Sequence, residues 1–208
     1  MRKKLTLVVS ASVTIGVLVT IIAMVTIMNL HRWVSDDQSE IAQNLARTIA
    51  HSVEDELADI DYVLQVSADE IERQISTRQY TFESVTTFLG RQQDRFSSID
   101  LLRATNPQGE TLYGRGVDPT ERASLAQRDY YRQLKENPNL GMVIAEPIIG
   151  KISRKWIWLM ARRINNPDQS FAGLVYASIF VDDLSKSFER FHLVPGGEII
   201  LRDRNMHV

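Results

Sequence analysis

The sequence predicts an α+β fold, in which helices flank an antiparallel sheet and an apolar helix anchors the N-terminus in a membrane. Three observations lead to this prediction. Runs rich in β-branched and aromatic residues follow one another at 141–149, 155–164 and 171–180. An apolar stripe with helical spacing extends over 35–76, and an uncharged run covers 5–30. Runs of the first kind suit a pleated, half-buried sheet, whereas three- and four-residue apolar steps mark one face of a helix.

The uncharged run from Leu5 to Leu30 is longer than the roughly 20 residues needed to cross the hydrocarbon core of a bilayer. No small-residue cleavage site follows it, so we expect an uncleaved transmembrane helix. Basic residues at 2–4 precede the run and acidic residues follow it from Asp36 onward. The positive-inside rule then predicts a cytoplasmic tail at 1–4. The chain is expected to be single-pass in the inner membrane, with everything after the helix outside.

A long extracytoplasmic helix is expected over 31–76, because the segment from Ser35 contains neither Gly nor Pro and carries a single apolar stripe. We expect the stripe to pack on the sheet and its membrane-near part to pair with a second copy, giving a homodimer. A scaffold helix without this pairing is the alternative. The stripe consists of Ile41, Leu45, Ile49, Val53, Leu57, Ile60, Leu64, Ala68, Ile71 and Ile75.

Further elements complete a membrane-distal domain, expected over 77–194. Helices are predicted at 82–96, 128–135 and 182–191, and strands at 99–104 and 110–113 on either side of a turn at 106–109. The Pro and two Gly at 195–197 read as a hinge, and 198–202 as a new strand. The segment 195–208 is therefore expected to begin a second, truncated module.

Composition excludes several classes of function. The net charge of -2, from 24 basic and 26 acidic residues, gives no footprint for nucleic acid. The chain has no cysteine, and its four histidines show no metal-ligand spacing. Phosphate loops and nucleophile elbows are also absent from the sequence. We therefore expect no catalytic residues, no metal and no cofactor in this chain.

A candidate ligand pocket lies on the middle strand of the predicted sheet. Because side chains alternate, Arg154, Trp156, Trp158 and Met160 are expected to share one face. A charged Arg beside two Trp would suit a small anionic or polar ligand. The alternative is an exposed Arg whose aliphatic stem covers a Trp.

Taken in order, the layout resembles the extracytoplasmic double-Cache (PDC) sensor domains of bacterial receptors, from about residue 31 to the end. The run 145–179 looks most like the variant fused to diguanylate cyclases, and histidine kinases and chemoreceptors carry close relatives. The resemblance implies a PAS-like sheet in the membrane-distal module, and a second transmembrane helix and output domain beyond this chain. It rests on the segments Asp100–Gly109, Arg128–Tyr131, Ile144–Ile148, Asn166–Leu174 and Ile199–Asp203.

The amino-acid-binding members of that family carry an Arg-x-Trp-Tyr run on the corresponding strand. Arg154 and Trp156 match its Arg and Trp, whereas Ile157 replaces the Tyr. Ser178 stands where the family's ammonium-binding Asp is expected. The resemblance thus implies that the carboxylate anchor is kept and the ammonium anchor lost, so a small carboxylate or other anion is expected rather than an α-amino acid.

Three tyrosines, Tyr130, Tyr131 and Tyr176, are further pocket candidates, with ordinary core tyrosines as the alternative. The expected function is ligand sensing by a membrane-bound receptor, whose parent protein is expected to be a diguanylate cyclase. A histidine kinase or chemoreceptor is the first alternative. A tethered dimerisation domain that binds nothing is the second.

Overall fold

The computed structural model describes residues 2–118, 120, 122–150, 153–188, 191 and 198–200, without the side chains of 2–15, 17, 27, 29–40 and 187. The chain divides into two units, Met1–His51 and Ser52–Val208. The first unit is the N-terminal part of helix α1 (Arg2–Ser76). Within the part of the chain that the structure describes, no helix is long and apolar enough to cross a membrane. Most of the predicted transmembrane segment, 5–30, has side chains outside the described set.

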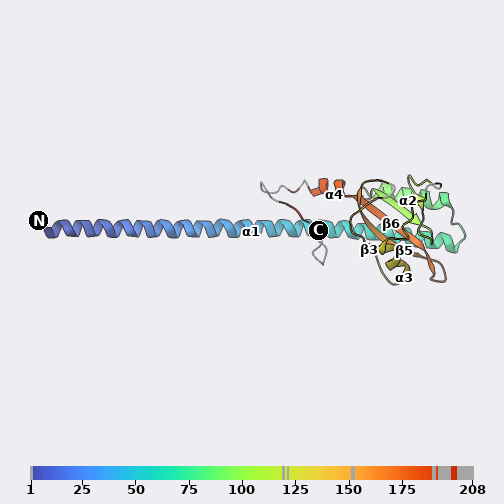
Figure 1. Ribbon diagram of the computed structural model, residues 1–208, viewed down its shortest axis with the longest axis horizontal. Coiled ribbons are helices and arrows are strands. Elements are labelled where there is room, and N and C mark those ends of the chain that lie inside the picture. The colour runs from blue at the N-terminus through green and yellow to red at the C-terminus, as the bar shows by residue number, and fades with distance from the viewer. Residues whose placement is uncertain are drawn as a thin grey trace. The chain divides into compact units, whose positions relative to one another are not determined.

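The second unit is built on an antiparallel sheet, whose described strands run in the order β2-β1-β6-β5-β3, with β4 also paired to β5 (Figure 1). The central pair, β5 and β6, is in register over most of its length. The strands are β1 (Leu101–Thr105), β2 (Thr111–Gly114), β3 (Val143–Ile144), β4 (Ile148–Ile149), β5 (Trp156–Asn165) and β6 (Phe171–Phe180).

The two long central strands confirm the sequence prediction to within one residue at each end. The prediction of one strand over 141–149 is wrong, because 145–147 separates β3 from β4. Pro147 lies in this gap, where it has no amide hydrogen to give to a ladder. The turn between β5 and β6 closes as expected, with the Asn166 amide donating to the Ser170 carbonyl at 2.9 Å.

Helices cover both faces of the sheet. Figure 1 shows α2 (Phe82–Arg95) and α3 (Asp129–Glu136) on opposite sides of β5 and β6. Both confirm predicted helices, and α2 begins at a capping box formed by Thr81 and Ser84. Helix α4 (Val181–Phe188) is shorter than predicted over the described residues, with 189 and 190 outside them. Of the strand expected at 198–202, residues 198–200 have no regular structure and the rest lie outside the description.

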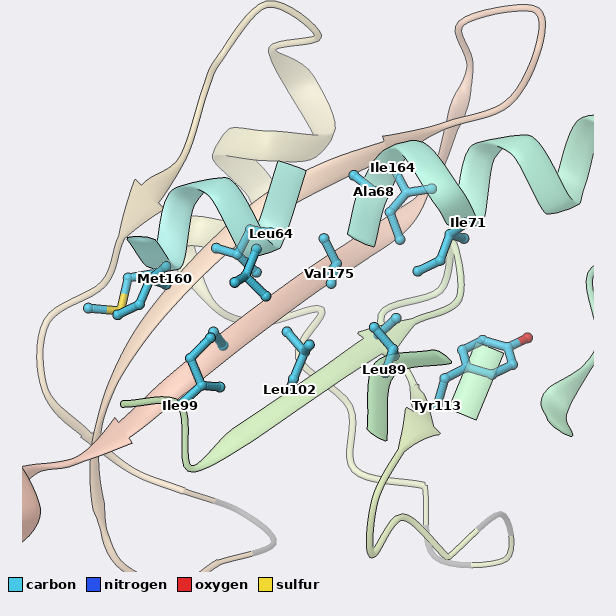
Figure 2. Close-up of a cluster of buried hydrophobic side chains, with 14 of the residues drawn as sticks. Leu64, Ala68, Ile71, Leu89, Ile99, Leu102, Tyr113, Met160, Ile164 and Val175 are labelled. Atoms are coloured by element: carbon cyan, nitrogen blue, oxygen red, sulfur yellow. The ribbon is translucent and has the colours of Figure 1, made fainter. Parts of the chain in front are cut away.

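One hydrophobic core, the α1-side core, fills the space between the sheet and helices α1 and α2 (Figure 2). The buried positions Ile60, Leu64, Ala68 and Ile71 confirm that the predicted stripe packs on the sheet. The sheet contributes alternate residues from its strands, as strand geometry requires. Among the side chains that meet the stripe are Leu102, Met160, Ile164 and Val175.

Polar contacts also hold α1 against β5. The Arg162 guanidinium donates to both carboxylate oxygens of Asp61, at 2.6 and 2.9 Å. Three helical turns further along α1, Glu72 accepts from the backbone amide of Asn165 at 2.7 Å. Bidentate pairs of this kind restrict orientation as well as distance. This stretch of α1 is therefore fixed to the strand at two points.

A second core, the α3-side core, covers the opposite face of the sheet. Helix α3 contributes Tyr130, Tyr131 and Leu134, all buried. The sheet contributes the other set of alternating residues, Ile157, Leu159, Ala161, Leu174 and Tyr176. The candidate site lies in this second core.

Candidate ligand-binding site

A small cavity lies within the α3-side core. Its volume is about 30 Å³, room for two to three water-sized groups. Its walls come from strands β1, β2, β4, β5 and β6, from α3 and from the loops before α3 and β5, so distant parts of the chain must fold together to form it. The lining residues are Leu101, Arg103, Thr111, Ala123, Leu125, Arg128, Tyr130, Ile148, Gly150, Ser153, Ile157, Leu159 and Tyr176.

Arg103 is the most unusual residue of this cavity. Strand alternation turns Leu102 and Ala104 into the α1-side core and leaves Arg103 on the cavity face, opposite Tyr176 of β6. Arg103 is only 5% exposed, and its Nη2 donates to the Arg115 carbonyl at 3.2 Å. Its Nε has no hydrogen-bond partner, and no ion pair of Arg103 occurs among the described residues. A buried charge without a counter-charge carries a desolvation cost.

Hydroxyl groups line the same cavity as this guanidinium. The hydroxyls of Thr111 and Tyr176 are 3.1 Å apart and form a hydrogen bond. The Tyr130 hydroxyl is buried and has no partner. Burial raises the pKa of Tyr176, an effect that the bond with Thr111 and the charge of Arg103 oppose. Burial likewise raises the pKa of Tyr130. Both tyrosines therefore stay protonated at neutral pH and can donate hydrogen bonds.

Gly114 lets the Arg103 side chain occupy this position. It has a φ of 120°, and a Cβ added there would lie 2.7 Å from Cγ of Arg103 and 2.6 Å from the Leu102 carbonyl oxygen. Any other residue would be strained by its backbone and would displace one of these neighbours. The end of β2 thus accommodates the arginine next to it.

Two of the predicted site residues, Tyr130 and Tyr176, line the cavity. Ser178 lies on the same face of β6 as Tyr176, opposite Leu101 and Leu159, and its buried hydroxyl has no partner. Ser178 is not one of the described residues that line the cavity.

Tyr131 has the environment of an ordinary core tyrosine. Its hydroxyl donates to the Pro107 carbonyl at 2.7 Å. Its ring meets that of Phe171 edge-on, with centroids 5.5 Å apart. The hydroxyl is therefore engaged with the backbone rather than with the cavity.

The structure does not bring Arg154, Trp156 and Trp158 to the cavity. Arg154 is exposed in the turn before β5, where its φ is 57° and its amide donates to the Gly150 carbonyl. Trp156 is 56% exposed, and the half-buried Trp158 packs against the α1-side core. The physical reason is register: the alternate residues of β5, among them Ile157, face the cavity, so the tryptophans lie on the opposite face.

Sequence reasoning missed Arg103. The signal is present as a single charge within the apolar strand Leu101–Thr105, at a position that alternates with buried Leu102 and Ala104. A charged residue is rare at a strand position that faces a covered side of the sheet, unless it has a partner. The sequence does not show which face of this strand is covered, because helix α3 comes about 25 residues later in the chain.

Comparison with known proteins identifies the fold. No protein-family model and no curated protein matches the sequence. The extracellular domain of the putative histidine kinase rpHK1S-Z16 is similar in structure, with a TM-score of 0.67 and 24% identity over 76% of this chain and 64% of that domain. The chain has the fold of a sensor domain.

Chemoreceptor domains share this sensor fold. The ligand-binding domain of Campylobacter jejuni Tlp3, in complex with 4-methylisoleucine, has a TM-score of 0.57 and 13% identity over 69% of this chain and 58% of that one. The ligand-binding domain of Mlp24 with asparagine has a TM-score of 0.55 and 13% identity, over 69% and 57%. The chain spans less than two thirds of each of the three domains.

These similarities support the expected Cache-like, PAS-like arrangement of a sheet with a long helix. The link to diguanylate cyclases stays a prediction.

Proposed function

We propose that this chain is the extracytoplasmic ligand-sensing region of a membrane-bound receptor, and that a small carboxylate or other anion binds in the cavity around Arg103. The observation that carries the proposal is a buried guanidinium with an unpaired Nε and no carboxylate partner among the described residues. The sensor fold of its structural neighbours supports the sensing role. An anion bound there would supply the missing counter-charge.

The uncharged run 5–30 supports anchorage in the inner membrane, with the basic tail in the cytoplasm and the sensor outside. The helical stripe before Ser52 supports a homodimer through α1. Ligand binding would then shift the population between two dimer arrangements. The proposed segments are a cytoplasmic tail at 1–4, a transmembrane helix at 5–30, a long helix at 31–76, a membrane-distal module at 77–194 and the start of a second module at 195–208.

The output domain of the parent protein is left between alternatives. The resemblance of 145–179 favours a diguanylate cyclase. A histidine kinase or chemoreceptor agrees equally well, since the similar structures come from such receptors. A tethered dimerisation domain without a ligand is less suited to the unpaired polar groups around Arg103.

Thermal unfolding of the whole chain in detergent, against a panel of carboxylates, inorganic anions and amino acids, tests the proposal. A ligand at one hundred times its Kd stabilises the folded state by about 2.7 kcal/mol, which shifts the Tm of a domain of this size by several degrees. We expect a saturable rise in Tm that Arg103→Met abolishes and that Arg154→Ala leaves intact. The opposite pattern in the two variants would return the anchor to Arg154.

A further inference from the structure

The geometry around Arg103 points to a narrower class of ligand, an inference that rests on the proposed function. We infer that the site takes a compact monoanion of the size of formate or acetate, held by Arg103 and by the hydroxyls of Thr111, Tyr130 and Tyr176. Charge, hydrogen-bonding capacity and volume lead independently to this class.

The charge of the cavity suits a single negative charge. Arg103 is the one fully buried ionised group among the described lining residues, and none of these residues is acidic. Arg128 is half-buried at the edge of α3 and can share its charge with solvent. A dianion would have only the half-buried Arg128 to match its second negative charge, and the ammonium of an amino acid would find no carboxylate among the described lining residues.

Its hydrogen-bonding groups are those of an anion receptor. The Nε of Arg103 and the hydroxyl of Tyr130 are both free to donate. The hydroxyls of Thr111 and Tyr176 share one hydrogen between them, so the second hydrogen of the pair is available. A carboxylate accepts about four hydrogen bonds in total, which these three donors do not exceed.

The volume sets an upper limit on size. A space of about 30 Å³ holds two to three water-sized groups, enough for the three heavy atoms of formate and close to the four of acetate. Apolar side chains line the rest of the cavity, and they suit the methyl group of acetate. The apolar part of the wall consists of Leu101, Leu125, Ile148, Ile157 and Leu159. Each further methylene of a longer carboxylate would have to displace part of this wall.

Titration of the whole chain with a size series of sodium salts tests the inference. Formate, acetate, propionate, butyrate, succinate and L-asparagine are compared by Tm shift and calorimetry, with ionic strength held constant by the sodium salt of a bulky sulfonate buffer that is too large for the cavity. We expect formate and acetate to bind saturably, propionate to bind at least about tenfold more weakly, and the other three to give no shift, because one methylene is worth about tenfold in a fitted pocket.

Two variants and one control variant locate the site. Tyr130→Phe should weaken acetate binding by about tenfold or more, since it removes a donor to a charged group. Tyr131→Phe is the matched control, because that hydroxyl bonds to the Pro107 carbonyl, and its affinity should be unchanged. Arg103→Met should abolish binding, and if this variant does not fold, the tyrosine pair decides the result.

The outcomes separate the ligand class from the proposed function. Stronger binding of succinate, butyrate or L-asparagine that depends on Arg103 and Tyr130 would overturn the compact monoanion and leave the sensor site in place. Acetate binding that survives Tyr130→Phe and Arg103→Met would place the ligand elsewhere. No binding by any member of the series or of the wider panel would overturn both proposals.

Discussion

Two buried arginines on the same face of the sheet should respond in opposite ways to the same substitution. Arg103 is 5% exposed and Arg163 is 8% exposed. Arg163 is fully engaged: it donates to the carbonyls of Leu134, Lys135 and Gln169 and to the side chain of Asn165. Arg103 makes one hydrogen bond to a carbonyl, interacts with the Tyr176 hydroxyl and leaves its Nε unpaired. If Arg103 is kept for a ligand, the ligand-free protein should be more stable without it.

The expected magnitudes follow from these contacts. In Arg103→Met, removal of a buried unpaired donor returns about 1–3 kcal/mol, against about 1 kcal/mol for the one lost hydrogen bond. The carbonyl left behind belongs to the exposed Arg115 and can bond to water. We expect a net gain of up to about 2 kcal/mol. In Arg163→Met, several buried acceptors lose their donor, and we expect a loss of about 2–4 kcal/mol.

Urea unfolding of the ligand-free chain, followed by circular dichroism, measures both values. The buffer must contain no small carboxylate or inorganic anion that fits the cavity, because a bound anion would restore the stability that Arg103 costs. The slope of the unfolding free energy against urea should stay unchanged, so that shifts in midpoint report stability alone. A loss in Arg103→Met as large as that in Arg163→Met would refute the reasoning, because Arg103 would then be a structural residue with satisfied contacts.

Three further experiments test particular contacts. In thermal unfolding, Gly114→Ala should lower the stability by at least about 2 kcal/mol, because strain and close contact combine at its φ of 120°. Gly90→Ala in α2 should raise the stability by about 0.5–1 kcal/mol, because an added Cβ there meets nothing closer than 3.7 Å. A double-mutant cycle of Asp61→Asn and Arg162→Gln should give a coupling of about 1 kcal/mol that shrinks in 1 M salt, since both side chains are partly exposed. Burial and a neighbouring carboxylate raise the pKa of Asp100, so its contribution to stability is present at low pH and is lost as pH rises through the folded-state pKa. Asp100→Asn should therefore become more stable relative to the wild type as pH rises from the ordinary carboxyl pKa of about 4 towards neutrality, and a constant difference in urea midpoint would contradict this cause.

Local patterns predicted the central sheet because its strands are long and strongly β-forming. The ends of β5 and β6 follow from turn residues such as Asn166. Adjacent residues such as Leu159 and Met160 are both buried, because both faces of the sheet are covered. The strand predicted over 141–149 failed at Pro147, since a pattern of apolar residues does not register a missing amide hydrogen.

The site was harder to predict than the fold, because it depends on which face of a strand is covered. Arg154 and Trp156 were placed by strand alternation and by a family resemblance, but in the structure the first lies in a turn and the second faces away from the cavity. Tyr130 and Tyr176 were found because aromatic residues with polar tips favour cavity walls. Arg103 required knowledge that β1 pairs with β6, a contact between residues more than 70 positions apart.

Strands β5 and β6 connect the cavity to the long helix. On β6, Tyr176 lines the cavity while its neighbour Val175 packs beneath α1. On β5, Leu159 lines the cavity, and Arg162, three residues on, holds Asp61 of α1. A ligand that shifts either strand by a fraction of an ångström must therefore also move groups that pack against α1, because close-packed cores transmit displacement rather than absorb it. Loss of ligand response in Asp61→Asn with ligand affinity unchanged would be the signature of this route.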